Sequence, residues 1–151
     1  MKLNLILLMT IFLLTACDKD DNEVNDDQAP YISDILHDGI NVKGDAFETF
    51  QGEKLQITII ATDGGFIESM HVTVRQTEST GEGLNTTSLE YNETFTIDQY
   101  ETATQVVLIA AEISETTDLG VYQIDVEVTD DSGNASISTT SFTLIAATIE
   151  Q

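Results

Sequence analysis

Oxygen-bearing side chains gather at two turns of the sequence, where together they could hold a hard cation. The string "ATDGGF" contains Asp63, and the string "VTDDSGN" contains Asp130, Asp131 and Asn134. Calcium takes roughly six to eight oxygen ligands from carboxylates, amides and carbonyls. These side chains are therefore candidate calcium ligands if the two turns lie together. Asp, Gly and Asn are also what tight turns use without any ion, so turn chemistry and a bound ion both remain open.

The only cysteine of the chain, Cys17, stands between an apolar run and an acidic run in "LLTACDKDD". Residues 1–16 contain one basic residue, Lys2, then a mostly apolar run and the small pair Thr15 and Ala16, which is the layout of a secretory signal. A membrane-spanning helix needs roughly 20 apolar residues, and this run is shorter. The segment therefore predicts export rather than a transmembrane anchor.

The string "LTAC" resembles the lipobox of bacterial lipoproteins, in which the Cys thiol is joined to diacylglycerol and the chain is cut just before it. The resemblance implies a signal peptide over 1–16 and a lipid on Cys17. An acylated cysteine leaves no thiol to pair, so the exported domain is expected to be free of disulfides. The alternative is an ordinary signal peptide with a chance cysteine nearby.

An acidic segment follows the cysteine. Its start resembles the export signal that sends lipoproteins of Bacteroidota to the outer face of the outer membrane, and it consists of Asp18, Lys19, Asp20 and Asp21. The resemblance implies a lipid-anchored, cell-surface protein, with a periplasm-facing lipoprotein as the alternative. Residues 17–29 bury almost no apolar surface, so we expect the lipidated Cys and a flexible acidic tether there.

The charge balance excludes one class of partner. The chain has 5 basic and 27 acidic residues, a formal net charge of −22. Such a surface repels nucleic acid and anionic head groups, which are themselves polyanions. No nucleophile elbow, zinc-protease motif or phosphate-binding loop occurs in the sequence, and His37 and His71 are the only histidines. We therefore expect no catalytic residues, no enzymatic activity and no cofactor apart from the candidate calcium.

From Pro30 onward the sequence alternates between apolar and polar residues in short runs rich in Val, Ile and Thr, as β-strands do. The run at 105–113, "QVVLIAAEI", is apolar throughout and predicts a strand buried on both faces, with a short helix as the alternative. The pattern predicts one all-β sandwich domain over 30–151. Its expected strands number about seven and lie near 31–35, 54–62, 68–76, 93–97, 105–113, 121–129 and 141–146.

A short motif makes the fold more specific. Asp118, Gly120 and Tyr122 match the Asp-x-Gly-x-Tyr pattern that opens strand F of immunoglobulin-like domains. The resemblance implies a tyrosine corner, in which the Tyr hydroxyl bonds back to the backbone. Ile124 stands where antibody domains have a cysteine, and the chain has no Trp, so a disulfide-free bacterial variety is expected. Together with the lipobox and tether, this resembles the small Bacteroidota lipoproteins of the DUF4625 family, whose activity is not established.

The immunoglobulin-like topology also predicts which loops face away from the tether, namely those near 38–52, 77–92 and 111–119. Because loops on a rigid sandwich often carry binding, three aromatic residues there are candidate partner contacts: Phe47, Phe50 and Tyr91. The sequence thus favours a monomeric, non-enzymatic surface module that binds a protein or glycan or serves a larger complex. The alternatives are a structural spacer or coat protein and a calcium-dependent adhesion module. A further alternative, a small hydrolase, would need catalytic groups that converge in a pocket.

Overall fold

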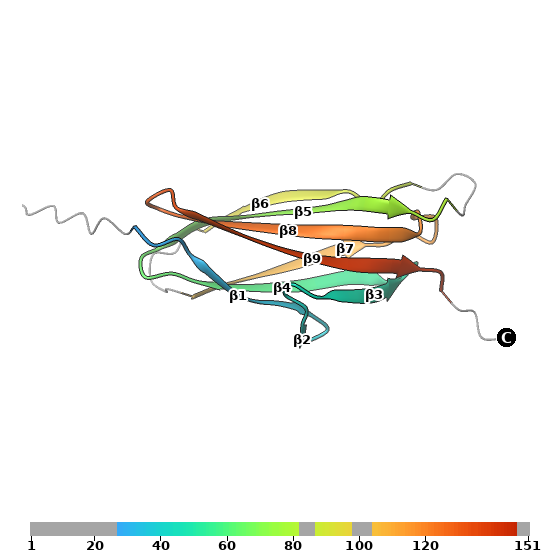
Figure 1. Cartoon of the computed structure of the whole chain (residues 1–151), viewed down its shortest axis with the longest axis horizontal. Helices are drawn as coiled ribbons and strands as arrows, with labels where there is room; N and C mark the ends of the chain where they lie inside the picture. The colour runs from blue at the N-terminus through green and yellow to red at the C-terminus, as the bar shows by residue number, and fades with distance from the viewer. Residues whose placement is uncertain (1–26, 82–86, 98–103, 148–151) are drawn as a thin grey trace, which may run out of the picture.

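Nine strands, and no helix, make up the part of the chain that the structure describes (Figure 1). The structure is a computed structural model, and it describes residues 27–81, 87–97 and 104–147. Within those ranges no helix could cross a bilayer. The strands are β1 (Tyr31–His37), β2 (Ile40–Asn41), β3 (Ala46–Phe50), β4 (Lys54–Thr62), β5 (Ile67–Ser79), β6 (Tyr91–Thr96), β7 (Thr104–Glu112), β8 (Gly120–Asp130) and β9 (Ala135–Ile145).

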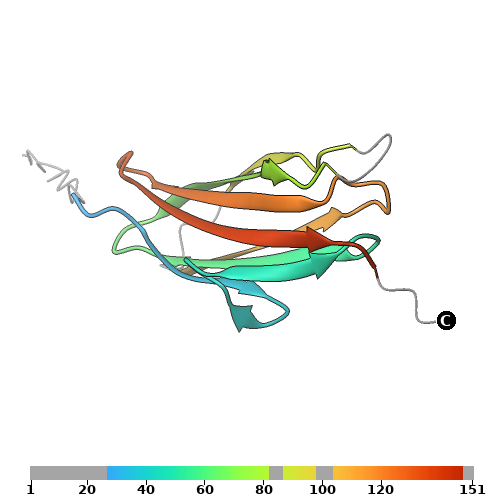
Figure 2. The same ribbon diagram turned by 45° about the vertical axis from the view of Figure 1, so that its right-hand side comes forward.

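The strands form two sheets that pack face to face (Figure 2). One sheet has the order β2-β1-β4-β7, and the other has the order β3-β9-β8-β5-β6. All neighbours are antiparallel except β3 and β9, which run parallel. The orders β1-β4-β7 and β9-β8-β5 correspond to strands A-B-E and G-F-C of the immunoglobulin fold. The prediction of an all-β, disulfide-free sandwich is therefore confirmed.

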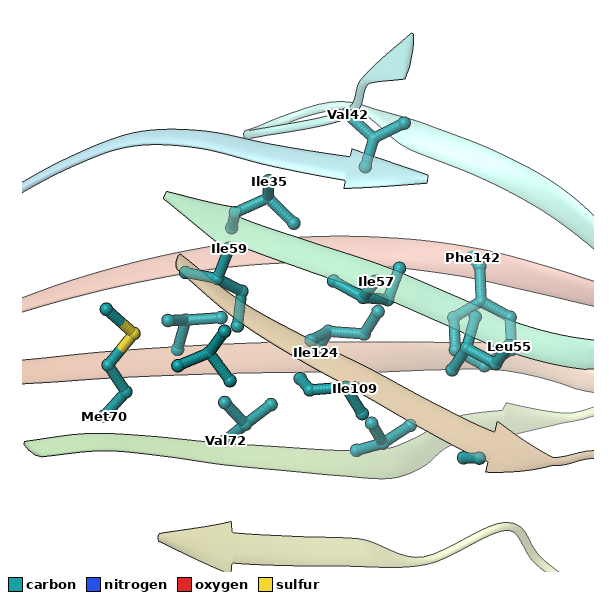
Figure 3. Close-up of a cluster of buried hydrophobic side chains, with 14 of the residues drawn as sticks. Ile35, Val42, Leu55, Ile57, Ile59, Met70, Val72, Ile109, Ile124 and Phe142 are labelled. Atoms are coloured by element: carbon teal, nitrogen blue, oxygen red, sulfur yellow. The ribbon is translucent and has the colours of Figure 1, made fainter. Parts of the chain in front are cut away.

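The core lies between the sheets because alternate residues of each strand point to the same face. In β4 the burial alternates along the strand, with Leu55, Ile57 and Ile59 at 0–1% exposure. The inward residues that the alternation of β5 and β8 predicts are buried as well. Side chains from both sheets meet in the cluster of Figure 3, where the labelled residues are Ile35, Val42, Leu55, Ile57, Ile59, Met70, Val72, Ile109, Ile124 and Phe142.

The segment 38–52, predicted as a loop, instead contains β2 and β3. β3 lies at the edge of the five-stranded sheet, where it pairs with β9 so that Phe47 is opposite Phe142. The hydroxyl of the buried Thr140 on β9 donates to the carbonyls of Val42, over 2.6 Å, and Asp45, over 2.5 Å. The segment is fixed by a strand far away in the sequence, which no local pattern reveals, and it raises the number of strands from about seven to nine.

The prediction that the run 105–113 is buried on both faces is wrong. β7 is an edge strand of the four-stranded sheet, and among the described residues it pairs only with β4. Val107 and Ile109 point into the core, whereas Val106 and Leu108 are 60% and 63% exposed. The run is a strand, as expected, but its outer apolar row is in solvent.

One end of the sandwich carries the start of β1 together with two turns (Figure 1). Tyr31, the first residue of β1, is opposite Thr62 at the end of β4, and Ile67 at the start of β5 is opposite Asp130 at the end of β8. The turns after β4 and β8 therefore lie at the pole where the chain enters the sandwich, as the topology predicts.

Candidate functional site

The two acidic turns are in direct contact at the pole where β1 begins. The backbone amide of Asp131 donates to the carbonyl of Phe66 over 3.0 Å, which ties the turn after β8 to the turn after β4. The condition for the candidate calcium site, that the two turns lie together, is therefore met.

The carboxylate of Asp130 is engaged within its own turn. It is fully buried, and its Oδ1 and Oδ2 accept hydrogen bonds from the backbone amide and the side-chain amide of Asn134, over 2.7 and 2.8 Å. Asp63 acts similarly, since its Oδ2 accepts from the amide of Gly65 over 3.0 Å, whereas Asp131 is exposed. Within the described ranges no three His, Cys, Asp or Glu side chains gather closely enough to hold a metal ion. These contacts indicate that the carboxylates of Asp63 and Asp130 stabilise their turns rather than bind an ion.

The Asp-x-Gly-x-Tyr motif forms one corner of the sandwich at the start of β8. The hydroxyl of the buried Tyr122 donates to the backbone carbonyl of Asp118 over 2.6 Å, which is the geometry of a tyrosine corner. Burial raises the pKa of Tyr122, so the hydroxyl stays protonated and remains a donor. The carboxylate of Asp118 accepts from Ser79 over 2.7 Å and from Gln76 over 3.1 Å. The motif joins β5 to β8, and its role is to hold the fold.

The three candidate aromatic contacts do not form one surface. Phe47 and Phe50 belong to β3 and Tyr91 begins β6, and these strands are the two opposite edges of the five-stranded sheet. All three side chains are half-buried. Burial and a hydrogen bond to Glu93 raise the pKa of Tyr91, whose hydroxyl donates to that carboxylate. The expectation that Phe47 and Phe50 lie in a loop is therefore wrong, whereas Tyr91 lies where a loop meets the start of β6.

A shallow groove, which the sequence does not predict, lies where β1, β2 and β3 meet. Its volume is about 560 Å³, and it is lined by His37, Asp38, Ile40, Asn41, Val42, Asp45, Ala46, Phe47 and Glu48. The ring of His37 stacks on Phe47 at a centroid distance of 4.3 Å. His37 Nδ1 lies 3.2 Å from the carbonyl of Gln56, and Nε2 lies 3.6 Å from the carboxylate of Asp38. We name this feature the β1–β3 groove.

The chemistry of the β1–β3 groove suits a cationic or hydroxyl-rich ligand. Its carboxylates come from Asp38, Asp45 and Glu48, and its apolar wall comes from Phe47 and the 69% exposed Ile40. The ring of Phe47 already stacks on His37 and Phe142, so the carboxylates would hold a basic side chain by charge attraction, and Phe47 and Ile40 would contact its apolar part. No apolar–polar alternation marks residues 46–50, and the groove becomes visible only once β3 is docked on β9.

The remaining candidate residues lie outside the described residues. They are the lipidation candidate Cys17 and the export-signal candidates Asp18, Lys19, Asp20 and Asp21.

Comparison with solved structures finds distant likenesses. The superoxide reductase (neelaredoxin) from Ignicoccus hospitalis has a TM-score of 0.45 and 8% identity, over 78% of this chain and 81% of that one. A Niemann-Pick type C2 protein from the Japanese carpenter ant has 0.46 and 8%, over 78% and 94%. The sporulation control protein Spo0M from Bacillus subtilis has 0.46 and 13%, over 80% and 51%. No curated protein matches the chain.

One family matches most of the sequence. The match covers residues 15–145, so it begins just before Cys17 and ends with the last residue of β9. This match shows that the chain belongs to the family described as Domain of unknown function (DUF4625).

Proposed function

We propose that this protein is a lipid-anchored, non-enzymatic module of the outer membrane. In this proposal it faces the cell surface, where it binds a protein or glycan or serves as an accessory subunit of a larger complex. Its supports are the lipobox-like string ending at Cys17 and the acidic segment after it, which together suggest a lipoprotein of Bacteroidota. The family match begins at residue 15, so it covers Cys17 and the acidic segment but not Leu14. Several acyl chains on Cys17 would make a lasting anchor, where one would hold only marginally.

The observation that carries the proposal is the order of parts along the chain. A cysteine suited to lipidation precedes an acidic segment, and the segment leads directly to β1 at one pole of the sandwich. With the lipid at that end, the other pole and the flank with the β1–β3 groove are free to meet a partner. A rigid sandwich on a polar tether suits presentation of a surface better than it suits catalysis.

The anchor is tested by labelling cells with radioactive palmitate. We expect label on the native protein and none on the Cys17→Ser variant, because the thioether requires the cysteine sulfur. Equal labelling of both proteins would contradict the anchor.

Surface display is tested with protease on intact cells. The native protein should be cleaved, and a variant with Ala in place of Lys19, Asp20 and Asp21 should be protected. If both proteins resist the protease equally in intact cells and are cleaved after lysis, the protein faces the periplasm.

Binding is separated from a spacer role by cross-linking on intact cells. A binding module gives a discrete adduct, and charge reversal in the β1–β3 groove, with Asp45→Lys and Glu48→Lys together, should reduce it. The matched control, Asp131→Lys, reverses an exposed carboxylate at the pole where β1 begins and should leave the adduct unchanged. A structural spacer or coat protein would give no adduct that depends on any one surface.

A further inference from the structure

β7 is a regular edge strand of the four-stranded sheet, and its outer edge is unpaired among the residues that the structure describes. All nine of its residues are in register with β4 without a shift, from Thr104 opposite Thr62 to Glu112 opposite Lys54. Among the described residues nothing pairs with its other side. Half of the backbone N–H and C=O groups of such an edge point outward, which makes it a template for another strand.

This edge lacks the features that usually protect an edge strand. Natural proteins block edges with charged residues, proline, bulges or very short strands. Residues 104–111 contain neither a charged residue nor proline, and the ladder to β4 has no bulge. Glu112, at the very end of β7, is its only charged residue.

The other edges of the described sandwich are protected. β2 has two residues, and β3 has five, with an exposed Glu48 among them. β6 carries exposed Asn92 and Glu93 in the middle of its six residues. The open edge is therefore particular to β7 and is not a general feature of this sandwich.

A short apolar row runs from β7 onto β4 on the outer face of the four-stranded sheet. Val106 and Leu108 are 60% and 63% exposed. Ile60 lies opposite Val106, and Leu36 lies beside Thr58, which is opposite Leu108. Ile60 and Leu36 are half-buried. A strand added beside β7 would lengthen this row, because cross-strand apolar pairs on one face stabilise a sheet.

We propose that the β7 edge binds an extended segment of another protein by strand addition, in which main-chain hydrogen bonds give affinity and alternate side chains give specificity. The proposal rests on the proposed binding function and gives the module a second contact surface, at the opposite edge of the four-stranded sheet from the β1–β3 groove. The segment alternates small polar and apolar residues and carries Lys or Arg rather than Asp or Glu.

Charge selects this occupant over a second copy of the chain. Each copy carries a net charge of −22, and like charges oppose association. The side chain of Glu112 is 79% exposed, and its Oε1 lies 3.1 Å from the ammonium of Lys54. This exposed carboxylate can also receive a basic residue at the end of an incoming strand.

The test uses the full chain in mild detergent and a fluorescent peptide of the sequence Lys-Thr-Val-Thr-Val-Thr-Val-Thr-Lys. We expect saturable binding by fluorescence anisotropy, and at least tenfold weaker binding of the analogue with Glu in place of both Lys residues. Hydrogen exchange should slow at the amides of β7 when the basic peptide is added. No saturable binding, or slowing at β6 instead of β7, would overturn the proposal.

Two edge variants and one control variant give the matched comparison. Leu108→Lys places a charge on the edge and should weaken peptide binding at least tenfold, and Val106→Lys should do the same. Ile137→Lys replaces a comparably exposed apolar residue, at 69%, on the other sheet, and this variant should bind the peptide as the native chain does. Equal binding by all three variants would count against the β7 edge. Self-association through β7 without peptide binding would make a second copy the occupant and overturn the proposal. The palmitate-labelling and surface-display tests of the proposed function do not depend on this result.

Discussion

The ring of Phe142 stacks on the ring of Tyr122, with centroids 5.1 Å apart and planes 8° apart. Phe142 also lies 5.5 Å from Phe47, which in turn stacks on His37 at the β1–β3 groove. A continuous row of rings therefore joins the groove to the tyrosine corner. Since Asp118 fixes the hydroxyl of Tyr122, the corner also supports the wall of the groove.

Tyr122→Phe tests that support. The substitution keeps the stacked ring but leaves the carbonyl of Asp118 without the hydroxyl donor that lies 2.6 Å away. We expect the free energy of unfolding to fall by about 1–2 kcal/mol, as measured by urea denaturation. The control Tyr31→Phe alters a side chain that is 63% exposed and should change stability by less than about 0.5 kcal/mol. Equal effects of the two substitutions would show that the corner bond adds nothing to stability.

Gly120→Ala tests the backbone of the same corner. Gly120 has φ of +144°, and a Cβ there would lie 2.0 Å from the carbonyl oxygen of Glu78. Because that atom belongs to the backbone of β5, the strand pair must shift, and we expect a loss of about 3 kcal/mol. Gly44→Ala is the matched control, with φ of +77° and open space at the Cβ, and should cost about 1–2 kcal/mol. Urea denaturation of both variants measures the difference, and similar losses would argue against the clash.

The predictable strands are those in which the alternation of apolar and polar residues matches the alternation of buried and exposed side chains. β4 and β8 alternate because one face of each meets the core, so the sequence shows which side chains are inside. β3 was missed because its partner β9 lies far along the chain. The environment of β7 was wrongly predicted because a run of apolar residues is typical of a strand buried on both faces, and here the outer row is exposed.

The candidate site likewise has features that the sequence predicts and features that it does not predict. The contact between the turns after β4 and β8 follows from topology, so it was predictable before any coordinates. That Asn134 donates to both carboxylate oxygens of Asp130 depends on side-chain positions inside one turn, and the sequence leaves both a bound ion and a plain turn open there. The β1–β3 groove needs three strands in place before it exists, so no motif could mark it.

Calcium is expected to leave the thermal unfolding midpoint of the full chain unchanged relative to chelator. Asn134 already bonds both carboxylate oxygens of Asp130, and Gly65 bonds Asp63, so an ion would have to displace protein donors. A ligand at 100 times its dissociation constant would add about 2.7 kcal/mol, which is readily detected. A higher midpoint in calcium that is absent in magnesium and lost in Asp63→Asn would instead establish the ion site.

Stability should fall at acidic pH partly through Asp125 on β8. Burial alone would raise the pKa of this carboxyl, but hydrogen bonds from Thr139 and Gln123 and the nearby charge of Arg75 more than offset it, so the pKa lies below its ordinary value of 3.8. Between the folded and ordinary values the unfolded chain binds more protons, so stability rises with pH. The contribution is therefore complete above about pH 5 and is lost as the pH falls through 3.8 toward the folded pKa.

Asp125→Asn makes this contribution measurable. The variant should be less stable than the native chain at pH 6, and the gap in urea midpoint should narrow as the pH falls from 6 to 3, because the unfolded chain takes up its proton before the native carboxyl does. Thr139→Val removes one donor, the hydroxyl that lies 2.7 Å from Asp125 Oδ1. This variant should also be less stable than the native chain at pH 6, by a smaller amount than Asp125→Asn, and its difference from the native chain should also shrink as the pH falls. A gap of constant size from pH 6 to pH 3 would mean that Asp125 acts through packing and not through its charge.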